Sequence, residues 1–408
     1  MRILFLTETI PAPLDSGGRI KTFHTLGMLA TRHEISCQTF IRTPGQRAHA
    51  ALLEDRCESV ALHLVPRSPL REAISAVRAL GTGRPFTLVR HNHRAAHAAI
   101  RALARREPFD LVYCDHLSMV QYGRGLGLPL LYDAHNVEWE LVARHATTLA
   151  RPARAAARLE AARLRLEEAR ACREASLVLT LTEANERALR LLAPSSRIRT
   201  LPIALDVRGT PRTLKPASTP HVLFVGGLHW PPNAQGLEWF VTHIWPIVRH
   251  SVPDARMFCV GRASAAQRAR LEKATNVSVV GAVDNVEPWF RDARVLAVPL
   301  QSGSGMRVKI LDAFARRLPV VATPVGWEGI DAVAGRHLLS ADGPEAFARE
   351  LVRVLRDPDL AEALAEAGHR LALDRYDLAS VIRQLLAAVE GAASPGARSP
   401  AGRLKTAG

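Results

Sequence analysis

The segment SGSGMRVKILDAFARRLPVV, residues 302–321, places two cations directly after a turn rich in glycine and serine. Arg307 and Lys309 stand where an apolar helical pattern begins, and the preceding RVLAVPL has the composition of a buried strand. Ligands of parallel α/β domains collect beyond the carboxyl ends of the strands, where helix N-termini offer unpaired N–H groups. The segment therefore predicts an anion site, and a diphosphate is the obvious candidate ligand.

Helix geometry restricts this interpretation. Residues two apart on a helix point in nearly opposite directions, so both cations can face one ligand only if Arg307 lies in the loop or the first turn. Asp312 lies three residues after Lys309 and four before Arg316, and a ladder of surface ion pairs explains that spacing equally well. No GK[ST] follows the glycines, so the segment is not a P-loop.

The first half of the chain has its own candidate residues at the ends of predicted strands. Gly17 and Gly18 directly precede a helical pattern, so backbone could approach a substrate or phosphate there, although a plain tight turn needs the same residues. His116 follows FDLVYCD, and His135 lies in LYDAHNVE. Each histidine could position a hydroxyl group or assist proton transfer, and a structural role is the alternative for both.

The three histidines of the segment HNHRAAH suggest a metal site, but the residues around them do not support one. His93 and His97 lie one helical turn apart, but the HExxH glutamate is absent and no carboxylate or cysteine is close in sequence. We therefore expect no metal there. No GxGxxG follows a strand, which argues against a dinucleotide-dependent oxidoreductase.

Strand-like and helical segments alternate throughout, which predicts parallel sheets covered by helices. Two segments far apart, RILFLTETIPAPLDSGG and HVLFVGGLHWPPNAQG, open alike with a strand, a loop and a helix. The further predicted strands are HEISCQTF, ALHLVP, FDLVYCDH, LPLLYDAHN and ASLVLTLT in the first half and ARMFCVG, NVSVVGAV, RVLAVPL and LPVVATP in the second. We predict a first Rossmann-like domain over 1–205, a linker over 206–219, a second domain over 220–376, a helix over 377–390 and a disordered tail over 391–408.

Composition limits the classes of partner. The 408 residues are 48% hydrophobic and 23% charged, as in globular proteins, and no run approaches the roughly 20 apolar residues of a membrane span. Five scattered cysteines indicate a reducing cytoplasm. A net charge of +15 favours nucleotides, lipid headgroups or nucleic acid, although a GC-rich genome also yields arginine-rich chains. The helix expected over 151–175 presents either a solvated charged surface or a membrane-contacting face.

The chain resembles glycosyltransferase family 4, similar to the sugar transferases of bacterial exopolysaccharide clusters. VLFVGGLHWPPNAQGLEWF and VGAVDNVEPWFRDARVLAVPLQSGSGMRVKILDAFARRLPVVATPVGWEGI resemble the second domain, and PLDSGGRIKTFHTL and LYDAHNVEWE the first. The resemblance implies a GT-B fold, in which two Rossmann-like domains face a cleft and the final helix packs back on the first domain. It also implies a retaining transferase that binds a nucleotide-diphosphate sugar in the second domain and the acceptor mainly in the first, without a metal.

The resemblance extends to single positions. The acidic pair of the family falls on Ser304 and Asp312, so Asp312 would bind the ribose, and contacts with the sugar would pass to the amides of Gly305 and Met306. Arg307 and Lys309 would stabilise the charge that grows on the leaving nucleoside diphosphate. The expected donor contacts also include Gly17, Gly18, Gly226, Gly227 and Val283, and His116 and His135 match positions near the reacting sugar. Gly227 and Asn233 occupy about the places of the family's Arg and Lys.

We therefore expect a cytoplasmic hexosyltransferase at the inner face of the plasma membrane, which transfers sugar to a saccharide or lipid-linked acceptor and needs no cofactor. Three alternatives remain. The serine at position 304 suggests a non-catalytic GT-B subunit that supports a partner transferase. A sugar-nucleotide epimerase would consume donor without acceptor. A nucleic-acid-binding protein is suggested by charge alone, and 5% aromatic residues offer few stacking platforms.

Overall fold

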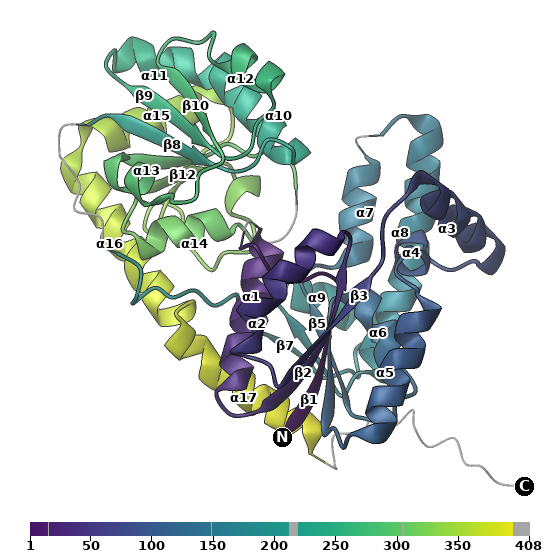
Figure 1. The fold of residues 1–408 in the computed structure, drawn as a ribbon. Helices are drawn as coiled ribbons and strands as arrows, with labels where there is room; N and C mark the ends of the chain where they lie inside the picture. Colours follow the sequence, from purple (N-terminus) through teal and green to yellow (C-terminus); the bar gives the residue numbers. More distant parts are fainter. Residues whose placement is uncertain (15, 148, 212–218, 304–305, 395–408) are drawn as a thin grey trace, which may run out of the picture. The chain divides into compact units, whose positions relative to one another are not determined.

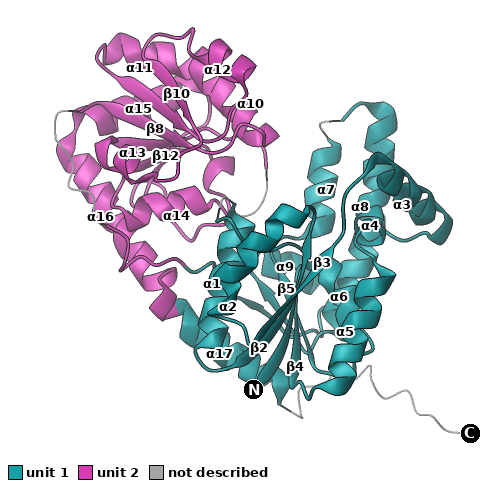
Figure 2. Cartoon of the chain, in the orientation of Figure 1, with its two compact units in different colours: residues 1–204, 381–408 teal, residues 205–380 magenta. Residues whose placement is uncertain are grey.

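The computed structural model describes residues 1–14, 16–147, 149–211, 219–303 and 306–394. The chain divides into two compact units, residues 1–204 with 381–408 and residues 205–380, coloured separately in Figure 2. The predicted linker, 206–219, falls partly on residues outside this description, and so does most of the predicted tail, 391–408. Each unit is described by itself.

Unit 1 is built on a parallel sheet with the order β3-β2-β1-β4-β5-β6-β7, seven strands among the described residues. Its central strands are apolar runs with both faces covered, as parallel sheets require. The strands are β1 (Arg2–Thr7), β2 (Glu34–Ile41), β3 (Ser59–Leu64), β4 (Leu111–Asp115), β5 (Leu130–Ala134), β6 (Leu177–Thr180) and β7 (Ile198–Thr200).

Helices cover both faces of this sheet (Figure 1). They are α1 (Gly17–Ala30), η1 (Pro44–Ala50), α2 (Ala51–Glu54), α3 (Pro69–Thr82), α4 (Phe86–Arg90), α5 (Arg94–Arg106), α6 (Leu117–Gly123), α7 (Glu138–Ala146), α8 (Arg151–Glu174) and α9 (Glu183–Leu192). The helix predicted over 151–175 is thus α8. Its buried side chains include Leu164 and Cys172, whereas Leu159 and Leu166 are exposed.

Unit 2 repeats the same strand order as β10-β9-β8-β11-β12-β13. Its strands are β8 (His221–Val225), β9 (Arg256–Val260), β10 (Val277–Gly281), β11 (Val295–Val298), β12 (Val320–Ala322) and β13 (Leu339–Ser340). Its helices are α10 (Pro231–Trp239), η2 (Phe240–Ile244), α11 (Trp245–Ser251), α12 (Ala265–Leu271), α13 (Glu287–Asp292), α14 (Val308–Ala315), η3 (Val325–Trp327), α15 (Pro344–Arg356) and α16 (Pro358–Arg375). Every strand predicted from the sequence is present, and the expected parallel α/β architecture is confirmed.

The strand order fixes where each unit can bind a ligand. In each sheet the chain first adds strands on one side and then crosses to the other, so the order reverses between β1 and β4 and again between β8 and β11. Ligands of such sheets bind in the crevice at the carboxyl ends of these strands. Ligands are therefore expected at the loops after β1, β4, β8 and β11.

The final helix α17 (Leu378–Ala393) starts in unit 2 and continues into unit 1, as the return helix of the predicted fold should. Glu390 on α17 lies 3.9 Å from Arg32 Nη1 and 4.0 Å from His33 Nε2 in unit 1. The helix runs three residues past the predicted end at 390.

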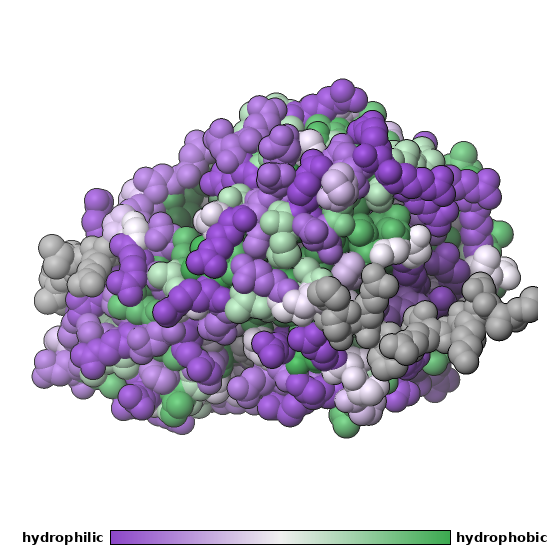
Figure 3. Space-filling model, turned by 90° about the horizontal axis from the view of Figure 1, so that it is seen from below, coloured by the Kyte–Doolittle hydropathy of each residue, from purple (hydrophilic) through white to green (hydrophobic). Residues whose placement is uncertain are grey.

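The surface carries many charges. Hydrophilic side chains cover most of the face in Figure 3, and hydrophobic residues gather in small groups between them. Among the described residues, no helix is both long enough and apolar enough to cross a membrane. The five cysteines are all buried and free of disulfides.

Candidate functional site

Unit 2 brings two of the predicted cations to the carboxyl ends of β8 and β11. Helix α14 begins at Val308 with Arg307 as its N-cap residue, so Arg307 lies in the loop. This placement meets the condition under which Arg307 and Lys309 can face one ligand. Lys309 Nζ donates a hydrogen bond to Asn233 Oδ1 at 3.0 Å and lies 4.9 Å from the centre of the Phe224 ring.

Gly226 and Gly303 allow the main chain to lie close to Lys309 and Arg307. A Cβ atom on Gly226 would lie 2.7 Å from Asn233 Nδ2 and 2.8 Å from Lys309 Nζ. Asn233 Nδ2 donates to the carbonyl of Gly227 at 3.0 Å. A Cβ on Gly303 would lie 2.9 Å from the Arg307 guanidinium. Main chain thus approaches both cations at a distance that a side chain would not permit.

The electrostatics of the site favour an incoming anion. Burial, followed by the charge of Arg307, lowers the pKa of Lys309 to about 7. A buried ammonium beside a guanidinium is relieved by negative charge, which restores the ordinary pKa of the lysine. Arg307 itself is buried. Two buried cations next to main-chain glycines therefore favour an anionic ligand at this place.

The contacts of Asp312 agree better with the predicted ladder of surface ion pairs than with a role in binding a nucleotide diphosphate. Its carboxylate pairs with Arg316 one turn later, and Arg316 Nε also donates to Glu287 Oε2 at 3.0 Å. Burial raises the pKa of Asp312, and Arg316 opposes that rise. Lys309 bonds to Asn233 instead of Asp312, so the predicted ladder forms only over its second half.

Of the other residues of unit 2 predicted to contact the donor, the structure describes Val283 and Met306. Val283 is half-buried beyond the carboxyl end of β10, which is the edge strand of the sheet. The Met306 carbonyl accepts a hydrogen bond from the Val308 amide, so Met306 belongs to the turn that opens α14. Ser304 and Gly305 lie outside the described residues.

Unit 1 has a buried carboxylate at the corresponding place, the carboxyl end of β4. Asp115 accepts hydrogen bonds from Thr7 Oγ1 at 2.7 Å and Thr22 Oγ1 at 2.8 Å. These bonds go to Oδ2, which also lies 3.3 Å from His116 Nδ1, and the other oxygen, Oδ1, lies 2.7 Å from His135 Nε2. Asp115 therefore joins β1, α1 and both predicted histidines.

The rings of the two histidines are in tilted contact, and their pKa values are shifted in opposite directions. Their ring centres lie 3.8 Å apart, and His116 has a left-handed backbone with φ 85°, which is costly for a residue with a side chain. Burial opposes protonation of His116, but Asp115, Glu8 and Glu138 outweigh it and raise its pKa to about 9. Burial and the charges of His116 and Lys21 lower the pKa of His135 to about 3. The directions of these shifts make His116 the more readily protonated ring of the pair, which suits it to donate a hydrogen bond.

A second buried carboxylate neighbours the first. Asp133, at the end of β5, is bound by Lys21 Nζ and Tyr113 OH. Lys21 Nζ also lies 4.0 Å from Asp115. A Cβ on Gly18 would lie 3.8 Å from His135 Nδ1, so the predicted glycine pair opens α1 beside the histidines. Gly17 and Gly18 thus belong to the unit 1 site.

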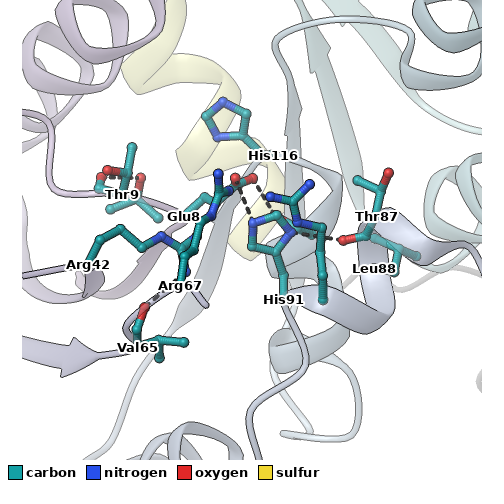
Figure 4. Close-up of polar contacts among 12 residues, drawn as sticks. Glu8, Thr9, Arg42, Val65, Arg67, Thr87, Leu88, His91 and His116 are labelled. Atoms are coloured by element: carbon teal, nitrogen blue, oxygen red, sulfur yellow. Dashed lines mark hydrogen bonds and ion pairs between the residues drawn. The ribbon is translucent and has the colours of Figure 1, made fainter. Parts of the chain in front are cut away.

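Sequence reasoning missed Glu8, which directly follows β1. Figure 4 shows its carboxylate between His91 and His116. Glu8 Oε1 lies 3.0 Å from His91 Nε2, and Ser118 Oγ donates to Oε2 at 2.8 Å. Burial alone would raise the pKa of Glu8, but His91, His116 and Ser118 outweigh it and lower that pKa. The signal in the sequence was an acid at the end of an apolar strand.

Asp115, His116 and His135 offer metal-ligand atoms within 4.8 Å of one another. These atoms already bond one another, and the Lys21 ammonium lies 4.0 Å from Asp115, so a metal ion would meet a cation in place. The residues therefore fit a metal poorly. Within the described residues, His93 and His97 join no such cluster, and the His97 ring stacks on Tyr122 at 4.1 Å.

Comparison with solved structures assigns the fold class. The chain is similar to HepE from Anabaena, solved with UDP and glucose (TM-score 0.66, 16% identity, 96% of this chain and 99% of HepE). It is similar to sucrose-phosphate synthase from Thermosynechococcus elongatus (TM-score 0.69, 18% identity, 95% of this chain and 100% of the synthase). It also resembles a TarM mutant from S. aureus, solved with Fondaparinux, alpha-GlcNAc-glycerol and UDP (TM-score 0.64, 10% identity, 95% and 99% coverage). The predicted GT-B fold is confirmed.

Sequence comparison finds a match within unit 2. Residues 219–357 match the family described as Glycosyl transferases group 1. A curated relative, the uncharacterized 44.6 kDa protein in the cps region of Klebsiella pneumoniae, is 25% identical over 173 residues. That alignment covers 40% of this chain and 45% of the relative, less than half of either.

Proposed function

We propose that this protein is a glycosyltransferase that moves a sugar from a nucleotide-diphosphate sugar to a saccharide or lipid-linked acceptor. The observation that carries the proposal is the convergence of Lys309, Asn233 and the main chain of Gly226 at the end of β8, with Arg307 at the start of α14. The match of residues 219–357 to Glycosyl transferases group 1 covers these groups. Neighbours of the same fold bind UDP, which supports a nucleoside diphosphate as the ligand.

The cations supply the chemistry expected of the donor site. When the bond between sugar and diphosphate breaks, negative charge accumulates on the diphosphate oxygens. Lys309 and Arg307 would neutralise that charge, and cations fixed in a dry site stabilise it more than water does. We propose that transfer retains the anomeric configuration, as in family 4, and needs no metal because side chains neutralise the diphosphate.

Unit 1 would supply the groups that orient the reacting sugar or acceptor. His116 is partly exposed, whereas Asp115 and His135 behind it are buried. Its protonated ring can donate a hydrogen bond to a hydroxyl, and Asp115 holds the ring in place through Nδ1. We propose a cytoplasmic enzyme of exopolysaccharide or other cell-surface glycan synthesis, in keeping with the cps-region relative.

The enzyme reading is tested by donor turnover. The purified chain is incubated with UDP-, GDP-, ADP- and dTDP-sugars, with and without a mixture of saccharide acceptors, and release of nucleoside diphosphate is measured. We expect one donor to be consumed, slowly alone and faster with an acceptor. Conversion of a donor to another sugar nucleotide without acceptor indicates an epimerase. A nucleotide that binds and is never consumed favours a non-catalytic subunit.

The lowered pKa of Lys309 gives donor binding a defined pH dependence. Because the diphosphate restores the ordinary pKa, binding above pH 7 takes up a proton, and affinity should fall by up to about tenfold per pH unit between about pH 7 and pH 9. Below pH 7 the ammonium is already charged and affinity should level off. Calorimetry with an intact nucleotide sugar, whose phosphates do not titrate there, measures both affinity and proton uptake.

The matched control for this pH dependence is Lys309→Met, which retains the length of the side chain without a titrating group. Its binding should be weaker and flat over the same pH range. An equal pH dependence in the variant would assign the titration to another residue and contradict the placement of the diphosphate at Lys309.

A further inference from the structure

Helix α3 of unit 1 exposes an apolar stripe. Leu70, Ile74 and Val77, at positions i, i+4 and i+7, share one face, and Leu80 adjoins it. Their exposed fractions are 70%, 42%, 69% and 68%. Only Ala79, on the opposite face, is buried. The helix lies beside α4 at the outer side of its unit in Figure 1, so it turns large apolar side chains to the outside.

A basic pocket of about 250 Å³ adjoins this stripe. It is lined by five arginines, Arg42, Arg67, Arg71, Arg78 and Arg90. Glu72 is the acidic residue of its wall, 3.4 Å from Arg90 and 3.9 Å from Arg67. Glu72 and the nearby Glu8 are two carboxylates against five guanidinium groups, so the pocket keeps an excess of positive charge.

The pKa values of Arg42 and His93 reflect the positive charge and the burial in this pocket. Burial, followed by the nearby Arg67, lowers the pKa of Arg42; Glu8 opposes this shift, and Arg90 adds to it. His93, also in the wall, is held neutral, because burial and then the charges of His91 and Arg42 lower its pKa to about 4. Figure 4 shows Arg42 in the same region as Glu8, whose charge acts on the pKa of Arg42.

The stripe and the pocket are parts of one surface. Ile74 belongs to both, and Arg71 and Arg78, seven residues apart, line the flank of α3 that faces the pocket. An apolar helix face next to clustered arginines matches the two layers of an anionic membrane surface, acyl chains below and phosphates above. An anionic sugar in solution would not explain the apolar stripe.

We propose that α3 docks unit 1 on an anionic lipid surface, with the arginine pocket holding the phosphate of a lipid that carries the acceptor. The stripe Leu70, Ile74, Val77 and Leu80 enters the acyl region, and the guanidinium groups bind phosphate oxygens. The proposal makes a phosphate-bearing lipid the acceptor of the transferase. Only this acceptor role rests on the proposed function; the docking of α3 on lipid does not. Arginine suits the task because its planar donors match phosphate oxygens in pairs.

The test is sedimentation of the full chain with vesicles of phosphatidylcholine, with and without phosphatidylglycerol, in the absence of any nucleotide. We expect strong binding only to the anionic vesicles, weakened by salt. The triple variant L70Q, V77Q and L80Q should lose at least about tenfold in affinity, because three exposed apolar side chains no longer enter the lipid. The double variant R71Q and R78Q should lose about tenfold or more.

The matched control is the double variant L159Q and L166Q on α8, which removes apolar side chains of similar exposure from another basic helix. It should bind vesicles like the unaltered chain. Equal loss in the α8 variant, or full binding by the α3 variant, overturns the proposal. Absence of binding to anionic vesicles by the unaltered chain also overturns it. Donor turnover is measured separately, so a failure here is distinguishable from a failure of the proposed function.

Discussion

Replacement of both donor-site cations, Lys309→Met with Arg307→Ala, should slow sugar transfer by at least about a hundredfold. Each cation would stabilise charge that develops on the leaving diphosphate, and loss of one such group costs about 3 kcal/mol, roughly a hundredfold in rate. Because the two lie side by side and Arg307 lowers the pKa of Lys309, their effects should not simply add. The double variant should be slower than either single variant and at least about a hundredfold slower than the unaltered chain.

The matched control is Lys273→Met, an exposed lysine of the same unit. Its rate should equal that of the unaltered chain. Initial rates with saturating donor separate the chemical step from binding, because a cation that acts on the leaving group lowers kcat as well as kcat/KM. An unchanged kcat in the double variant would refute the role of these cations in leaving-group stabilisation.

Replacement of Asp115 by alanine should be the most damaging single change to unit 1. Its carboxylate is fully buried and binds Thr7, Thr22 and His135, with His116 at 3.3 Å. Removing one partner of a buried charged network costs about 3–5 kcal/mol, because the others remain buried and unpaired. We expect hydrogen exchange to accelerate in β1, β4 and β5 and to stay unchanged in β8 and β11.

Asp110→Ala provides the control at the other end of the same strand. Asp110 is exposed and accepts one hydrogen bond from the amide of Arg2 at 2.8 Å, so its loss should cost about 1 kcal/mol or less. Equal protection of β4 in the two variants would mean that Asp115 does not organise the strand ends. Retained nucleotide binding by Asp115→Ala would locate the defect in unit 1.

The sequence predicts every interior strand and two of the four edge strands, β3 and β10, and it misses the shortest strand at the other edge of each sheet. Interior strands such as β4 and β11 are continuous apolar runs, because helices cover both faces of a parallel sheet. The strands that sequence reasoning missed, β7 (Ile198–Thr200) and β13 (Leu339–Ser340), are the short outer strands of the two sheets. A strand of two or three residues has no period to recognise, and only its neighbour in the sheet defines it.

The candidate sites divide in the same way. Arg307 and Lys309 could be found because they are close in sequence to a strand end and a glycine-rich turn. The hydrogen bonds around Asp115 and Asp133 in unit 1 could not be predicted from the sequence, because the bonded residues are far apart in the chain. Thr7 and Asp115 are separated by 108 residues, and Lys21 and Asp133 by 112. Only the parallel pairing of β1, β4 and β5 brings their carboxyl ends together.

The central claim is that unit 2 binds a nucleoside diphosphate through Lys309 and Arg307. The most direct measurement is a thermal-shift panel of UDP, GDP, ADP, dTDP, NAD and a DNA oligomer against the unaltered chain, Lys309→Met and Lys273→Met. One nucleoside diphosphate at a hundred times its Kd should add about 2.7 kcal/mol of stability to the unaltered chain and to Lys273→Met, and much less to Lys309→Met. Equal stabilisation of all three proteins, or a shift with DNA alone, would contradict the claim.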